Sequence, residues 1–216
     1  MYPLIKRAID IVFALAGLIV LSPVLVALGA WVAMSSPGGP FYSGVRIGRG
    51  AKPFRMLKFR TMVTNAHQIG ASSTAEDDPR VTSAGRFLRR FKLDELPQLL
   101  NVFAGQMSFV GPRPQVKWAV DLYTAEERSL LSVRPGITDY ASLRFRNEGE
   151  ILKGSADPDR DYLEKIAPEK IRLGLYYVRN YSFVADARIV IATLLSLGGV
   201  DPAWCLPTLS AAPQLA

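Results

Sequence analysis

The chain has 216 residues and a formal net charge of +7, and 49% of its residues are hydrophobic. This length suits one domain with an attachment segment, and this composition excludes a disordered chain. The single cysteine, Cys205, excludes a disulfide framework, and the single histidine, His67, excludes histidine-rich metal sites and argues against a Ser-His-Asp triad. We expect His67 to be an exposed loop residue.

The positive charge is concentrated in the middle third of the chain. Residues 35–113 carry twelve basic and five acidic side chains, whereas residues 114–216 carry twelve basic and thirteen acidic ones. Such a surplus favours an anionic partner, which could be nucleic acid, lipid headgroups or a phosphorylated substrate. Basic and aromatic residues are not interleaved here as they are on nucleic-acid-binding surfaces, so we expect no nucleic-acid partner.

An uncharged apolar stretch, residues 11–34, follows Lys6 and Arg7. It is long enough to cross a bilayer and too long for the core of a signal peptide. Ser22 and Pro23 divide it, and Pro23 should bend the helix while Ser22 bonds a carbonyl that the proline frees. Basic residues on both flanks favour a re-entrant helix-break-helix, which enters and leaves the bilayer on the same face. A kinked single span and a buried helix of a soluble protein remain alternatives.

The rest of the chain predicts an α+β, mostly helical fold with a small β-hairpin and amphipathic interfacial helices. The hairpin strands are residues 41–43 and 54–62, with a glycine-rich turn between them, and alternation puts Lys58 and Arg60 on one face. The remaining predicted elements are a loop at 65–79, helices at 80–93, from Asp94 onward, at 126–131, 168–181 and 183–197, basic loops at 110–114 and 134–138, and an irregular tail from 198.

The candidate chemistry lies at Asp94 and Glu95, directly after a run of basic residues. One interpretation is structural, with Asp94 capping a helix and Glu95 complementing its dipole. The other makes Asp94 a nucleophile or metal ligand for phosphoryl transfer, because a carboxylate that attacks phosphorus splits one hard transfer into two easier ones. The approach of two anions requires counter-charges, for which Lys58, Arg89 and Arg113 are the candidates. No glycine-rich phosphate-binding motif is present.

Several segments carry a resemblance to a known family: KRAIDIV with Ser22-Pro23, GGPFYSGVRIGRGAKPFRMLKFRTM, DDPRVTSAGRFLRRFKLDELPQLLNVFAGQMSFVGPRP and RPGIT. In this order and spacing, from about residue 6 to 138, the chain resembles the bacterial sugar transferase family, the monotopic phosphoglycosyl transferases that act on polyprenyl phosphate. The later segment YYVRNYSFVADARIVIATL matches more loosely.

The resemblance implies a division into a re-entrant membrane anchor (1–36), a catalytic domain on the cytoplasmic face of the bacterial inner membrane (37–197) and a C-terminal tail (198–216). It implies transfer of a phospho-sugar from a UDP-sugar to a polyprenyl (undecaprenyl) phosphate in glycan assembly, with UMP release and a covalent intermediate on Asp94. Asp94 and Glu95 would be the catalytic dyad, Mg²⁺ near Asp94 the cofactor, and membrane lipid a further partner. Lys58 and Arg89 would bind phosphate, and Pro112 with Arg113 would lie at the nucleotide.

Two departures from the family pattern concern the site. Lys92 stands where a small hydroxyl residue is expected, and residues 139–152 follow a less common variant, which leaves the sugar open. We also expect the minimal catalytic form, without membrane helices before Lys6, and a homodimer is a further possibility. The rival functions are a metal-dependent lipid glycosyltransferase that releases UDP and a non-enzymatic basic membrane adaptor.

Overall fold

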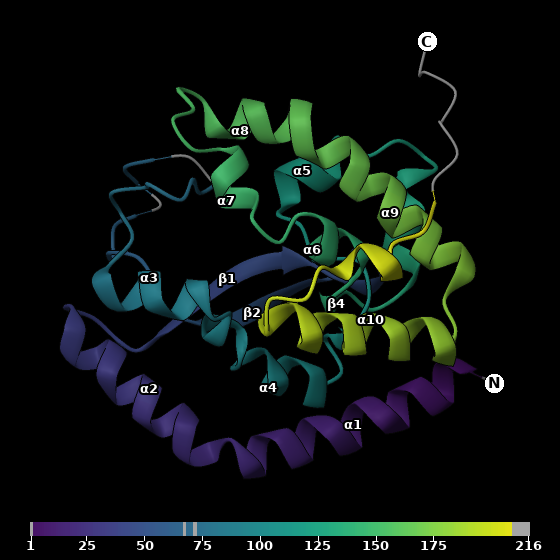
Figure 1. The fold of residues 1–216 in the computed structure, drawn as a ribbon, viewed down its shortest axis with the longest axis horizontal. Helices are drawn as coiled ribbons and strands as arrows, with labels where there is room; N and C mark the ends of the chain where they lie inside the picture. Colours follow the sequence, from purple (N-terminus) through teal and green to yellow (C-terminus); the bar gives the residue numbers. More distant parts are fainter. Residues whose placement is uncertain (1, 67, 71–72, 209–216) are drawn as a thin grey trace.

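The computed structural model describes residues 2–66, 68–70 and 73–208, so His67 lies outside the described residues. Within this part of the chain the fold is α+β and mostly helical, as the sequence predicts. Figure 1 shows a bent pair of N-terminal helices running along one edge of the molecule, with the strands and the remaining helices above it.

The predicted β-hairpin is confirmed. β1 (Phe41–Ile47) and β2 (Pro53–Phe59) pair antiparallel, with Phe41 opposite Phe59, and the 3₁₀ turn η1 (Arg49–Ala51) connects them. β1 is longer than predicted, because the start of the glycine-rich segment extends the strand instead of forming a long turn. β2 ends at Phe59, earlier than the predicted end at residue 62.

A second, parallel pair of strands was not predicted. β3 (Ser108–Val110) lies beside β4 (Gly136–Thr138). The sequence predicted residues 134–138 to be a loop, and this is wrong for the last three of them. Their backbone is needed as a hydrogen-bonding partner for the segment around Val110, which sequence periodicity does not reveal in strands of three residues.

Most remaining elements are short helices. They are α3 (Ser83–Arg90), η2 (Leu93–Glu95), α4 (Gln98–Phe103), α5 (Lys117–Asp121), η3 (Glu127–Ser132), α6 (Tyr140–Arg144), α7 (Glu148–Ile151), α8 (Pro158–Asp161), the π-helix η4 (Tyr162–Ile166), α9 (Ala167–Asn180), α10 (Phe183–Leu197) and η5 (Pro202–Cys205). The predicted helices at 168–181 and 183–197 are confirmed as α9 and α10. The described part of the tail is less irregular than predicted, because η5 packs the buried Cys205 against the core.

The bend of the N-terminal helix pair lies at the predicted position. α1 (Tyr2–Val20) and α2 (Ser22–Ser35) meet at 64°. Pro23 has no N–H to offer to the carbonyl of Ile19, and the Ser22 hydroxyl donates to that carbonyl at 2.8 Å. No single helix of the described residues is long and apolar enough to cross a membrane, whereas this bent pair meets the length and composition requirement together.

α1 begins well before the apolar stretch because its polar residues have partners in the rest of the fold. Lys6 pairs with the Asp186 carboxylate, and Arg7 donates to two carbonyls at the end of α4, Val102 at 2.7 Å and Phe103 at 2.9 Å. Asp10 accepts from the Ser108 hydroxyl and from the Phe109 N–H, each at 3.1 Å. The charges of Lys6 and Arg7 therefore hold α1 on the domain, in addition to marking the flank of the apolar stretch.

Three clusters of buried hydrophobic residues form the core. Its largest cluster joins β3, α6, α9 and α10. A second cluster joins Ala14 of α1 to Met56 of β2, and a third joins Val32 of α2 to Leu88 of α3. Both helices of the bent pair thus support the elements that carry the candidate site.

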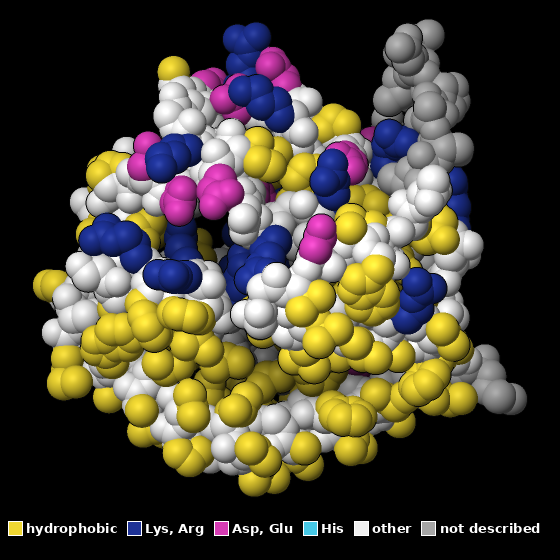
Figure 2. All heavy atoms as spheres, in the orientation of Figure 1, with side chains coloured by type: hydrophobic (Ala, Val, Ile, Leu, Met, Phe, Trp, Pro, Cys, Tyr) yellow, Lys and Arg dark blue, Asp and Glu magenta, His cyan; other side chains and the backbone are white. Residues whose placement is uncertain are grey.

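The outer surface of the helix pair is apolar. Figure 2 shows hydrophobic side chains gathered over α1 and α2, with lysine and arginine side chains gathered above them in the middle of the same face. The exposed apolar residues include Phe13, Val20, Val26 and Met34, which are 63–81% exposed. Contiguous apolar surface of this kind marks a contact with lipid or another protein.

Candidate functional site

The carboxylate pair lies in a tight turn between two helices. α3 ends at Arg90, Lys92 adopts a left-handed backbone with φ 56°, and η2 then carries Asp94 and Glu95. α4 begins only at Gln98, with Pro97 in its N-cap position. The structural interpretation of Asp94 as a helix cap is therefore wrong, because Asp94 lies one turn before the helix. A left-handed residue with a side chain is uncommon and costs free energy, so other contacts must hold this turn.

Glu95 is held by two cations from distant parts of the chain. Lys58, near the end of β2, places its Nζ 3.1 Å from Glu95 Oε1 and 3.9 Å from Asp94 Oδ2. The Arg113 guanidinium donates to both carboxylate oxygens of Glu95, with a distance of 3.1 Å from Nη1 to Oε2, and also to the Ile137 carbonyl at 3.2 Å. The predicted convergence of Lys58, Arg113 and the dyad is thus present in the structure.

The two carboxylates differ in their electrostatic environment. Burial raises the pKa of Asp94, and the negative charge of Glu95 adds to this, while Lys58 opposes both. Burial would also raise the pKa of Glu95, but Arg113 and then Lys58 hold it well below the usual range. Two adjacent carboxyl groups with pKa values pushed apart are a common feature of catalytic sites. Glu95 is the fixed anion, and Asp94 has the freer carboxylate.

Arg89 lies on α3 next to the dyad, and Thr61 orients it. Its Nε donates to the Thr61 hydroxyl at 2.9 Å, and burial lowers its pKa while the charge of Asp94 raises it. The helix approaches Thr61 through Gly85, where an added Cβ would lie 2.0 Å from the Thr61 carbonyl oxygen. Thr61 is a positioning residue that the sequence analysis missed, because a threonine after a strand carries no distinctive signal.

Arg60, which the sequence analysis placed with Lys58, has a different role. Its guanidinium donates to backbone carbonyls after α2, including Pro37 at 2.8 Å and Gly39 at 2.7 Å. Arg60 follows the end of β2, so strand alternation no longer sets its direction. It fixes the exit of the helix pair, whereas Lys58 serves the dyad.

The loop that carries Pro112 and Arg113 is held against β4. Gly136 donates its N–H to the Pro112 carbonyl at 3.1 Å. A Cβ on Gly111 would lie 2.4 Å from the Arg134 carbonyl oxygen, and one on Gly136 would lie 2.2 Å from the Gly111 nitrogen. Both positions therefore require glycine, and their close approach aims Arg113 at Glu95. The two basic loops of the sequence analysis are one structural unit.

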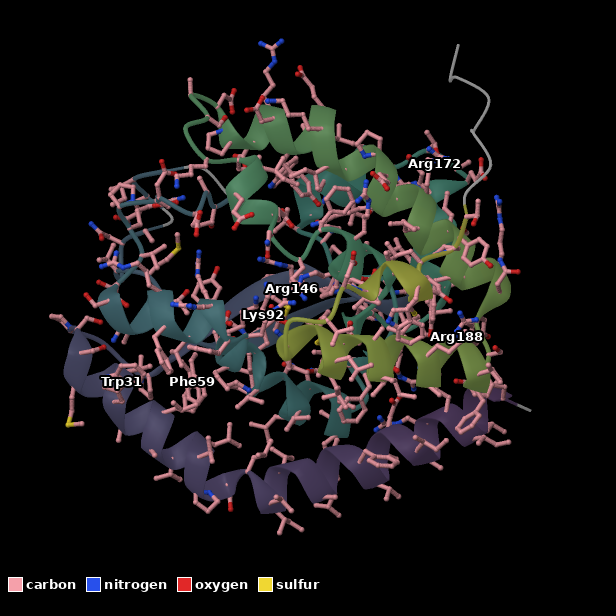
Figure 3. All side chains as sticks on the ribbon, viewed as in Figure 1. Trp31, Phe59, Lys92, Arg146, Arg172 and Arg188 are labelled. Carbon is pink, nitrogen blue, oxygen red and sulfur yellow. The ribbon has the colours of Figure 1, made fainter. Side chains whose placement is uncertain are left out.

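Further polar groups lie around the dyad. Figure 3 shows Lys92 and Arg146 near one another in the middle of the molecule, and the Lys92 Nζ lies 3.4 Å from the Arg146 carbonyl oxygen. Gln98, one turn after Asp94, is fully buried, and within the described residues its amide has no hydrogen-bond partner. Arg146 and Gln98 were not predicted, since neither stands in a motif that sequence reasoning could tie to the dyad.

The donor set around Asp94 fits Mg²⁺ in one specific manner. In the described residues no group of three or more histidine, cysteine, aspartate or glutamate side chains could enclose a metal ion. Glu95 is already bound by Arg113 and Lys58, which leaves the Asp94 carboxylate as the available hard oxygen ligand. Mg²⁺ is commonly held by one or two carboxylates together with substrate phosphates, so the residues fit an ion shared with a diphosphate.

Comparisons with known proteins show the family to which the chain belongs. The model of the family described as "Bacterial sugar transferase" matches residues 1–198. The chain belongs to this family. It is 36% identical to "Exopolysaccharide production protein ExoY" of Sinorhizobium fredii, over 93% of this chain and 85% of that protein.

Two larger relatives have names that state a reaction. The chain is 37% identical to "UDP-glucose:undecaprenyl-phosphate glucose-1-phosphate transferase" of Escherichia coli, over 88% of this chain and 39% of that protein. It is 34% identical to "UDP-N-acetylgalactosamine-undecaprenyl-phosphate N-acetylgalactosaminephosphotransferase" of Aeromonas hydrophila, over 91% of this chain and 44% of that protein. The chain is accordingly a transferase, and it spans less than half the length of these two relatives.

Proposed function

We propose that this transferase moves a phospho-sugar from a UDP-sugar to a polyprenyl phosphate, the first membrane step of polysaccharide assembly. The observation that carries the proposal is the buried Asp94 beside a Glu95 fixed by Arg113 and Lys58. Relatives that share most of this chain are named for sugar-phosphate transfer to undecaprenyl phosphate. A site with several fixed cations around one freer carboxylate suits attack on an anionic diphosphate.

The proposed reaction has two displacements at one phosphorus atom. An Asp94 carboxylate oxygen attacks the β-phosphorus of the UDP-sugar, and the bond from this phosphorus to the bridging oxygen breaks. UMP leaves with that oxygen and the electron pair, and the phospho-sugar remains on Asp94 as an acyl-phosphate. A phosphate oxygen of the polyprenyl phosphate then attacks the same phosphorus, which frees the carboxylate and gives a polyprenyl diphosphate-linked sugar.

The side chains around Asp94 have distinct proposed roles. Lys58, 3.9 Å from Asp94, reduces the repulsion between the carboxylate and the incoming phosphates, and Arg89 adds positive charge from α3. Glu95 keeps Lys58 and Arg113 in place, so that the cations are oriented before the substrate arrives. Mg²⁺, held by Asp94 and the diphosphate, would supply further neutralisation of phosphate charge.

We further propose that the helix pair is a re-entrant anchor in the bacterial inner membrane, with the catalytic domain on the cytoplasmic face. The apolar outer surface of α1 and α2 and their 64° bend support this arrangement. Arg60 ties the end of α2 to the domain, and Lys6 with Arg7 ties the start of α1, so both ends face the same body of protein. A shallow anchor brings the site to the level where a polyprenyl phosphate headgroup lies.

The nucleotide product separates this proposal from its rivals. Purified protein in detergent would be incubated with Mg²⁺, UDP-sugars and undecaprenyl phosphate, and the nucleotides would be separated by ion-exchange chromatography. We expect UMP in wild type and its loss in Asp94→Asn. UDP in place of UMP would indicate a glycosyltransferase, and no nucleotide product from any donor would favour a non-enzymatic adaptor.

A further inference from the structure

A cavity beside Arg113 adjoins the dyad. Its volume is about 120 Å³, and it lies between the loop after β3 and helices α5, α6 and α9. Arg113 lines this cavity and also binds Glu95, so one side chain contacts both. A cavity of about 150 Å³ accepts a benzene-sized ring, so this one suits a single ring and is too small for a whole nucleotide.

Six of the lining residues are polar or charged: Arg113, Gln115, Glu127, Asp139, Ser142 and Lys170. Asp139 is 2% exposed, and one of its oxygens accepts the Ser142 N–H at 2.7 Å. The Ser142 hydroxyl is buried and has no partner within the described residues. Lys170, whose side chain is 11% exposed, pairs with Glu148 at the same wall. Buried polar atoms without a partner are costly, and ligand sites are where such atoms are retained.

The charges of the cavity continue those of the dyad. Asp139 raises the pKa of Arg113 after the larger effect of Glu95, and Lys170 opposes the burial that raises the pKa of Asp139. Positive and negative groups therefore alternate from Lys58 through Glu95, Arg113 and Asp139 to Lys170. Arg113, which lines the cavity and binds Glu95, connects the cavity to the dyad.

The remaining wall is apolar. Eleven of the 17 lining residues are glycine, proline, aliphatic or tyrosine: Pro112, Ala119, Leu122, Tyr123, Leu130, Ala141, Tyr162, Leu163, Ala167, Ile171 and Gly174. A hexose presents hydroxyl groups around its whole ring, and those that face this apolar wall would lack partners. A planar heterocycle has apolar faces and a polar edge, which matches the wall and the polar groups.

We propose that this cavity binds the uracil base of the donor nucleotide, an inference that rests on the proposed function. The base N3–H would donate to the Asp139 carboxylate, and its carbonyl oxygens would accept from the Ser142 hydroxyl and the Lys170 ammonium. Arg113 then lies between the base and the dyad, where the phosphates of a nucleotide bound by its base would pass. The sugar lies outside this cavity, so the cavity selects the nucleotide and leaves the choice of sugar to other residues.

The test uses the full chain in detergent and UMP as the probe. Ser142→Leu fills the cavity, and Ser142→Ala removes the hydroxyl without filling it. We expect Ser142→Leu to weaken UMP binding and to raise the KM for the UDP-sugar by about tenfold or more, and Ser142→Ala to change both by about threefold at most. Ala119→Leu fills the cavity from α5 and serves if Ser142→Leu melts at a lower temperature than wild type.

Photo-crosslinking with 4-thio-UMP locates the base directly. Crosslinked peptides from residues 112–123, 139–142 or 162–174 support the proposal. Crosslinks confined to other segments, or UMP affinity within twofold of wild type in both filling variants, overturn it. If wild type forms a phospho-sugar adduct but either of these contrary results is obtained, the proposed function stands and the base lies elsewhere. If wild type forms no adduct and binds no UMP, both inferences fail.

Discussion

Arg113 is the residue whose removal should disturb the dyad most. Its guanidinium donates to both oxygens of Glu95, and the two side chains are 27% and 13% exposed. In Arg113→Met, Glu95 keeps the Lys58 contact at 3.1 Å but loses its larger source of positive charge. Removing one partner of a buried ion pair costs about 3–5 kcal/mol. Because the pair is partly exposed and Lys58 remains, we expect a loss of about 2 kcal/mol.

A double-mutant cycle measures this loss and assigns its cause. For a chain of this size about 2 kcal/mol corresponds to a fall in Tm of about 4–8 °C, measured by differential scanning fluorimetry in detergent at pH 7. In a Glu95→Gln background the same arginine substitution should cost at least about 1 kcal/mol less, because no unpaired carboxylate is left. Arg128→Met removes an exposed arginine and is the matched control, with Tm close to wild type. Strictly additive effects of Arg113→Met and Glu95→Gln would refute the ion pair as the cause.

Three further outcomes follow from the geometry. The depressed pKa of Glu95 contributes stability that is present above the ordinary glutamate range of about pH 4 and is lost as pH falls through the lower folded pKa. In Arg113→Met the free energy of unfolding should therefore fall less steeply with acid, and an unchanged slope would contradict this. Gly85→Ala should lower Tm, because the added Cβ would lie 2.0 Å from the Thr61 carbonyl oxygen. Alanine favours helices over glycine by about 1 kcal/mol, so a raised Tm would show that α3 does not pack against Thr61. Gln98→Met should keep or raise Tm, because it removes a buried amide without partners in the described residues. The same substitution should lower the rate of UMP formation by about tenfold or more, and an unchanged rate would show that the amide does not serve the site.

The sequence was sufficient to predict the elements whose signals are local. The hairpin, the bend at Ser22 and Pro23, and helices α9 and α10 each follow from turn residues, proline chemistry or a long apolar pattern. The convergence of Lys58 and Arg113 on Glu95 was also predictable, since the need for counter-charges beside a carboxylate pair restricts the candidates to the basic residues of the middle third.

What the sequence could not predict depends on contacts between distant residues. The start of α1 at Tyr2 follows from partners such as Asp186, which lies 180 residues from Lys6 in sequence. Strand β4 exists because Gly111 and Gly136 approach more closely than any other residue type allows. The turn that carries Asp94 depends on a left-handed Lys92, and a lysine gives no local indication of that conformation.

Whether Asp94 carries the phospho-sugar can be read from the intact mass of the protein. The protein would be mixed with Mg²⁺ and each UDP-sugar without lipid acceptor, quenched quickly under denaturing conditions and weighed by mass spectrometry. We expect an added mass equal to one phospho-sugar with the UDP-sugar that is the donor. The adduct should be retained at least in part by Glu95→Gln and be absent in Asp94→Asn. An adduct of the same mass in Asp94→Asn, or UMP formed with lipid acceptor from a wild type that never carries an adduct, would contradict this expectation.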